Sequence, residues 1–141
     1  MTRVAMSTQL NVPATQVWDI IGSFHGINDW LPGIEKSELE GGGTQRRLTL
    51  AGGAQVLEEL DQHSNDEHTY TYRIVESPLP LSGYAATIKV HDNGDGTSRV
   101  DWSSDFAPIG PEGDAKQIIE DVYNAGFENL QKMVAAFTPK G

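Results

Sequence analysis

Residues 114–137 read DAKQIIEDVYNAGFENLQKMVAAF, and this stretch decides the fold. Its apolar residues recur at helical spacing, which predicts an amphipathic helix of about 24 residues, near 36 Å long. Asp114 and Gln117 have the spacing of a capping box, so the helix is expected to begin at Asp114. Gly126 in the middle allows two interpretations, close packing on a strand or space for a ligand. The apolar stripe and its flank comprise Ile119, Val122, Tyr123, Gly126, Phe127, Leu130, Met133, Val134 and Phe137.

Alternating strands fill most of the chain before this helix. Residues 3–10 alternate at period two, and two short helices follow, over residues 13–22 and 26–30. Between residues 34 and 106, glycine-rich and asparagine-rich turns separate further strands. Because one phase of each strand is apolar and the other polar, we expect an α+β fold, with an antiparallel sheet of about seven strands covered on one face by the C-terminal helix. The apolar phases include Leu48 and Leu50; Tyr70, Tyr72 and Ile74; Tyr84, Ala86, Ile88 and Val90; and Val100, Trp102, Ser104 and Phe106.

The composition excludes several classes of function. The chain has 141 residues with 20 acidic and 10 basic side chains, and the resulting net charge of −10 opposes binding to nucleic acid or to an anionic membrane. The absence of cysteine excludes disulfides, thiolate metal sites and a cysteine nucleophile. No apolar run approaches the roughly 20 residues that span a bilayer. We therefore expect a single domain over residues 1–141 in the cytoplasm, without membrane insertion.

Three segments carry a family resemblance: Val12-Pro13-Ala14 with Val17-Trp18, Pro111–Asp114, and Asn129–Lys132. With the order of strands and helices, they resemble the helix-grip (SRPBCC) superfamily, which includes birch-pollen-allergen proteins, START domains and plant abscisic-acid receptors. The three segments are similar to the receptors. Over its whole length the chain looks more like the bacterial polyketide cyclase/dehydrase-like branch.

The resemblance implies an internal cavity between the sheet and the long helix. The inward phases support this, because a fully packed core favours aliphatic residues over tyrosine and tryptophan, whose polar atoms need partners when buried. The residues expected to bind a ligand are Leu31, Leu50, Gln55, Tyr70, Tyr72, Leu79, Leu81, Tyr84, Trp102, Ser104, Phe106, Tyr123, Phe127 and Asn129.

Comparison with the abscisic-acid receptors implies a neutral ligand. Tyr84 and Asn129 match receptor positions that make polar contacts with the ligand. Leu31 stands in place of the pocket lysine that pairs with the hormone's carboxylate, while Gln55 and Ser104 replace two pocket glutamates. Without the lysine, an apolar cavity cannot easily hold a carboxylate. We therefore expect a small, uncharged, lipophilic partner.

Candidate catalytic residues are few. Tyr72 and Tyr84 could donate hydrogen bonds to a carbonyl, and Glu59 is a candidate acid or base. The strand at residues 54–62 is ambiguous, since Gln55 and Glu59 lie in one phase and Val56, Glu58 and Leu60 in the other. Arg46 shares a phase with Leu48 and is expected either at the cavity mouth or in a surface ion pair. The histidines lack the spacing of metal ligands, and no cofactor or metal is assigned.

Three hypotheses of function follow. The first is binding of a small lipophilic molecule in the cavity by a monomer or weak homodimer. The second is a polyketide cyclase, aromatase or dehydratase that uses Tyr72, Tyr84 or Glu59. The third is an interaction protein that docks a partner through the Leu79–Leu81 loop, which could equally be an ordinary connection or a lip at the cavity mouth.

Overall fold

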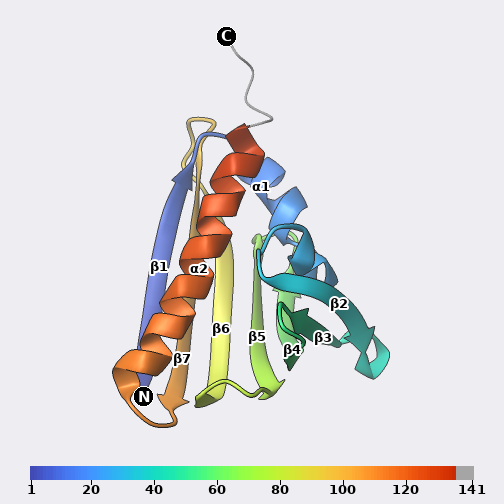
Figure 1. The fold of residues 1–141 in the computed structure, drawn as a ribbon. Helices are drawn as coiled ribbons and strands as arrows, with labels where there is room; N and C mark the ends of the chain where they lie inside the picture. Colours follow the sequence, from blue (N-terminus) through green and yellow to red (C-terminus); the bar gives the residue numbers. More distant parts are fainter. Residues whose placement is uncertain (136–141) are drawn as a thin grey trace.

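The computed structural model describes residues 1–135, which form an α+β fold in which a curved antiparallel sheet packs against one long helix (Figure 1). Seven strands lie in the order β1-β7-β6-β5-β4-β3-β2. The expected helix-grip architecture is confirmed, and Phe137 lies outside the described residues. The elements are β1 (Thr2–Leu10), α1 (Ala14–Ile21), η1 (Phe24–Asp29), β2 (Ile34–Glu40), η2 (Gly41–Gly43), β3 (Gln45–Leu50), β4 (Gln55–Ser64), β5 (Thr69–Glu76), β6 (Leu81–Asp92), β7 (Ser98–Pro108) and α2 (Glu112–Ala135).

Helix α2 begins two residues earlier than the sequence suggested. The Pro111 carbonyl accepts hydrogen bonds from the backbone N–H groups of Asp114 and Ala115 at 3.2 and 3.4 Å, so Asp114 lies within the first turn. The Gln117 side chain donates to Asp121 Oδ1 at 2.8 Å rather than reaching back to the helix start. The predicted capping box is therefore wrong. Glu112 and Asp114 still stabilise this end, because acidic groups interact favourably with the positive end of the helix dipole.

Helix α2 runs along β1 and β7, and strands β3 to β5 of the same sheet lie to one side of it (Figure 1). An added Cβ at Gly126 would lie 3.0 Å from side-chain atoms of both Trp30 and Leu31, so this glycine serves close packing. Val122, expected on the buried stripe, is 37% exposed. The buried residues of the helix are Ala115, Ile119, Tyr123, Gly126, Phe127, Leu130 and Val134.

The hairpin of β3 and β4 settles which face of β4 points inward. Leu48 pairs with Val56 and Arg46 with Glu58. Because opposed residues in an antiparallel pair point to the same face, Val56 and Glu58 face the interior with Leu48. The intervening turn contains Gly52 and Gly53, both in the left-handed region (φ 94° and 95°) that glycine adopts without strain.

No helix within residues 1–135 combines the length and the hydrophobicity that crossing a bilayer requires.

A cavity between the sheet and the C-terminal helix

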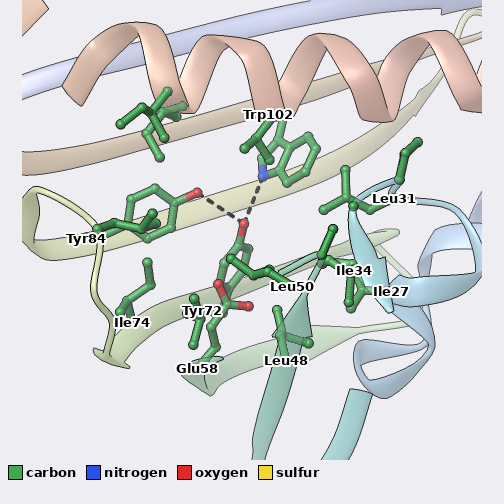
Figure 2. A pocket seen from close by; sticks show the side chains of 18 residues that line it. Ile27, Leu31, Ile34, Leu48, Leu50, Glu58, Tyr72, Ile74, Tyr84 and Trp102 are labelled. Atoms are coloured by element: carbon green, nitrogen blue, oxygen red, sulfur yellow. Dashed lines mark hydrogen bonds between the residues drawn. The ribbon is translucent and has the colours of Figure 1, made fainter. Parts of the chain in front are cut away.

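A cavity of about 230 Å³ lies between the central strands, the segment after η1 and the N-terminal half of α2 (Figure 2). Most of its wall is aliphatic. Four lining residues carry polar groups: Glu58 on β4, Tyr72 on β5, Tyr84 on β6 and Trp102 on β7. The apolar lining consists of Ile27, Leu31, Pro32, Gly33, Ile34, Leu48, Leu50, Ala51, Val56, Ile74, Leu79, Ile118, Ile119 and Val122.

Exposed residues in the lining mark the mouth of the cavity. Pro32, Gly33 and Ala51 are exposed, as is Val122 on α2. The backbone N–H of Ala51 donates to the Gly33 carbonyl at 2.9 Å, which ties the β3–β4 turn to the segment after η1. The cavity therefore opens beside this turn, between it and α2.

A chain of hydrogen bonds joins the polar aromatic side chains. Trp102 Nε1 donates to Tyr72 Oη at 3.0 Å, and Tyr72 Oη lies 3.2 Å from Tyr84 Oη (Figure 2). Tyr84 Oη in turn lies 2.6 Å from Tyr123 Oη. Burial raises the pKa of Tyr72 and Tyr84 well above 10, and neighbouring tyrosines raise it further. The cavity wall thus presents neutral phenols, which can donate a hydrogen bond without carrying charge.

Arg46 and Glu58 form a buried ion pair beside the cavity. Arg46 is 0% exposed, and its Nε donates to Glu58 Oε1 at 2.8 Å while Nη2 lies 2.7 Å from the same oxygen. Nη1 donates to the Phe24 carbonyl, and the guanidinium carbon lies 4.0 Å from the centroid of the Phe24 ring. Burial alone would lower the pKa of Arg46, but the opposing charge of Glu58, with smaller contributions from Tyr70 and Tyr72, raises it overall. The guanidinium therefore stays charged.

The carboxylate of Glu58 has one oxygen without a hydrogen-bond partner within residues 1–135. Oε1 holds the arginine, whereas Oε2 makes no hydrogen bond to any residue that the structure describes. Glu58 lines the cavity although it is only 7% exposed, and Figure 2 shows its carboxyl group below Tyr72. The cavity wall thus carries one charged group, Glu58, among otherwise uncharged lining residues of the described chain.

The structure brings together only part of the expected ligand set. Those that line the cavity are Leu31, Leu50, Tyr72, Leu79, Tyr84 and Trp102.

Glu59 and Gln55 are on the opposite face of β4, so their expected place in the cavity is wrong. Glu59 is ion-paired with Arg73, and Gln55 donates to Thr49 Oγ1 at 3.4 Å on the outer surface. They lie outside the cavity because the inward-facing residues of β4 are Val56 and Glu58, which alternate with Gln55 and Glu59 along the strand.

Seven other residues that were expected to bind a ligand do not line the cavity. Asn129 uses its side-chain N–H to bind the Trp30 carbonyl at 2.7 Å. Leu81 is buried at the start of β6, so it offers neither a cavity wall nor an exposed docking surface. The remaining members of this group are Tyr70, Ser104, Phe106, Tyr123 and Phe127.

The sequence prediction did not include Glu58. In the structure the pairing of β3 with β4 is centred on Gly52, which places Arg46 directly opposite Glu58. A turn centred between Gly52 and Gly53 would instead place Arg46 opposite Glu59, so the two glycines alone do not fix the register. The wall residues Ile27 and Ile34 were not predicted either, because they lie in or beside an irregular segment. No group of three His, Asp or Glu residues within the described part of the chain is placed to hold a metal ion.

An antiparallel sheet that curves around a long C-terminal helix and leaves an internal cavity defines the helix-grip class of proteins. The chain belongs to the polyketide cyclase / dehydrase and lipid transport family, whose model matches residues 1–135. No curated protein sequence matches the chain.

Solved structures agree with this assignment. XoxI from Bacillus cereus is 33% identical with a TM-score of 0.91, over 94% of this chain and 95% of its own. The aromatase/cyclase ZhuI from Streptomyces sp. R1128 is 19% identical with a TM-score of 0.75, over 94% of this chain and 92% of its own. Norcoclaurine synthase from Thalictrum flavum is 20% identical with a TM-score of 0.71, over 99% of this chain and 89% of its own. The last two show similarity of fold alone.

Proposed function

We propose that the protein binds a small, mostly apolar molecule in the cavity between the sheet and α2. The observation that carries the proposal is a 230 Å³ cavity with an aliphatic wall and four polar side chains gathered in it. Small-molecule sites are typically built this way, with an apolar wall for affinity and a few polar groups for orientation.

The size of the cavity limits the ligand. An engineered apolar cavity of about 150 Å³ binds benzene, whereas pockets for drug-sized ligands span about 300–1,000 Å³. The 230 Å³ here lies between these values and fits one substituted ring or a short branched chain. A larger fused-ring molecule would require the mouth beside Ala51 to widen.

Calorimetric titration with 4-ethyltoluene, an apolar single-ring probe, tests cavity binding. Ala51 is exposed and lines the mouth, so Ala51→Trp should close the cavity and weaken binding about ten-fold or more, equivalent to about 1.4 kcal/mol. Ala85→Trp is the matched control, because Ala85 is exposed on β6 and does not line the cavity. Equal binding by the two variants would contradict the proposal.

A second candidate function is proton-transfer catalysis on a polyketide-like substrate. The observation that favours it is a carboxylate, Glu58, in the same cavity as the hydroxyls of Tyr72 and Tyr84. Glu58 would remove a proton next to a substrate carbonyl while a tyrosine donates a hydrogen bond to the carbonyl oxygen. Mass spectrometry of a short polyketone thioester incubated with the protein would detect a cyclised or dehydrated product. Unchanged turnover in both Glu58→Gln and Tyr72→Phe would rule this function out.

A further inference from the structure

We infer that Glu58 Oε2 is a binding subsite for a neutral hydroxyl group, and that the natural ligand of the cavity carries such a group on an otherwise apolar skeleton. The inference rests on the proposed binding function and narrows it to one chemical class. It follows from three properties of the Arg46–Glu58 pair.

The first property is that one oxygen of the carboxylate is available. The hydrogen bond from Arg46 Nε and the ion-pair contact of Nη2 both go to Oε1, and Oε2 has no hydrogen-bond partner among residues 1–135. The carboxylate lines the cavity. A carboxylate oxygen has two acceptor sites, and a ligand that displaced water from them without supplying a donor would incur the cost of desolvating a charged group. A ligand hydroxyl would remove this cost.

The second property is charge balance. The guanidinium of Arg46 is fully buried and already compensates the negative charge of Glu58. A negative charge on the ligand would have no opposite partner, since Glu58 is the one charged residue among the described residues that line the cavity. An anionic ligand would also be repelled by Glu58 directly. The pair therefore selects a neutral donor over a carboxylate or phosphate.

The third property is rigidity. Arg46 is fixed by the Phe24 carbonyl and by the Phe24 ring, and the register of β3 and β4 places Glu58 directly opposite it. The hydroxyls of Tyr72 and Tyr84 lie in the same cavity and can hold an oxygen of the ligand as donors or acceptors. A hydroxyl is the group that can donate to Glu58 and also bind a tyrosine. An acceptor fixed in one position loses less conformational freedom on binding than a mobile one, so it discriminates more strongly between ligands with and without a donor.

The test compares ligands of matched shape by calorimetric titration. 4-Ethylphenol and 4-ethyltoluene differ by a hydroxyl in place of a methyl group, 4-ethylanisole has an oxygen that only accepts, and 4-ethylbenzoate is an anion. We expect the phenol to bind about ten-fold more tightly than the anisole, as for a hydrogen bond to a charged group. The benzoate should bind most weakly of the four.

Variants then locate the preference. In Glu58→Gln the ratio of phenol to anisole affinity should fall several-fold, because a hydrogen bond to a neutral acceptor is about half as strong. The double variant Arg46→Met with Glu58→Leu removes both charges together and should abolish the preference while 4-ethyltoluene still binds. Glu59→Gln, on the outer face, is the matched control and should leave the ratio unchanged. Circular dichroism checks the fold of each variant.

The ligand series on the unmodified protein decides the question even if a variant fails to fold. If 4-ethyltoluene binds but phenol and anisole have equal affinities, the hydroxyl subsite is overturned and cavity binding stands. The subsite is likewise overturned if the preference persists in the folded double variant. If none of the four ligands binds, the proposed function fails and the subsite fails with it.

Discussion

The two halves of the interior are covered differently, although the same sheet supports both. On the side of β1 and β7, the 24 residues of α2 pack onto the sheet, and the rings of Trp102 and Tyr123 stack with centroids 4.0 Å apart. On the side of β3 to β5, the cover is the short η1, the segment that follows it and the edge of α2 at Ile118, Ile119 and Val122. The cavity and the Arg46–Glu58 pair lie there. We call these the filled half and the hollow half.

The difference shows how one fold separates stability from binding. The filled half is close-packed: Val100 and Leu130 are 0% exposed and do not line the cavity. The hollow half contains the open volume and the Glu58 oxygen that has no hydrogen-bond partner within residues 1–135. The hydrogen bonds from Tyr72 through Tyr84 to Tyr123 lie along the boundary and connect the two halves. Changes in the filled half, in the hollow half and at their boundary should therefore affect stability and binding differently.

High pH should destabilise the folded protein through the buried tyrosines that lie between the two halves. The pKa values of Tyr72, Tyr84 and Tyr123 are raised above the ordinary 10.0, chiefly by burial, so the folded state retains protons that the unfolded state releases. This contribution to stability is complete below pH 10 and is lost as the pH rises above it. At about 1.4 kcal/mol per group and pH unit, we expect a loss of about 4 kcal/mol by pH 11.

Urea unfolding at rising pH measures this loss, and Tyr84→Phe should make the pH dependence shallower. Tyrosinate absorbance provides an independent check, because Tyr72, Tyr84 and Tyr123 have strongly raised pKa values and should stay protonated in the folded protein near pH 10. Tyrosinate formation at pH 10 without unfolding would contradict the burial of these side chains.

Removal of one member of the buried pair should be strongly destabilising. Glu58→Ala leaves the Arg46 charge buried without its partner, which typically costs about 3–5 kcal/mol. Glu59→Ala, one residue along the same strand, breaks a partly exposed pair with Arg73 and should cost less than about 1 kcal/mol. Urea unfolding compares the two variants, and equal losses would mean that β4 does not direct Glu58 inward.

Truncation of a leucine to alanine should reduce stability more in the filled half than in the hollow half. Leu130→Ala in the filled half opens a sealed void and should cost about 2–5 kcal/mol. Leu50→Ala at the mouth of the cavity removes a half-buried side chain next to space that already exists, and about 1 kcal/mol is expected. Thermal unfolding of both variants measures the difference. A greater loss at Leu50 would reverse the assignment of the halves.

The smallest effect is expected at Asn129, which connects α2 to the wall of the hollow half. Asn129→Ala removes the hydrogen bond to the Trp30 carbonyl and should cost about 1 kcal/mol. The affinity for 4-ethyltoluene should change little, because Asn129 does not line the cavity. A loss of binding as large as that of Ala51→Trp would instead place Asn129 in the ligand site.

The regular parts of the fold could be predicted from the sequence, because alternation and helical spacing are local. The phase of β4 could not be read from the strand alone, since Val56 and Leu60 occupy one phase and Leu57 the other, with a glutamate in each. Its pairing with β3 decides the phase, and that pairing is a long-range property. For the same reason Glu59 was chosen as a candidate in place of Glu58.

The cavity wall was only partly predictable for a second reason. Tyr72, Tyr84 and Trp102 lie on strands with clear alternation, and they do line the cavity. Tyr123 and Phe127 on α2 also point inward, but their rings pack against Trp102 of the sheet. Inward orientation in the sequence does not distinguish such a packed position from an open one. That distinction depends on how far the helix covers the sheet.

Methyl NMR during titration with 4-ethyltoluene shows directly whether the ligand binds in the hollow half, because it reports on both halves of the interior at once. We expect the signals of Leu48, Val56 and Ile74 to shift with ligand concentration, while those of Leu10, Val100 and Leu130 stay unchanged. Shifts concentrated at the second set, or no shift at the first set at saturating ligand, would contradict a binding cavity in the hollow half.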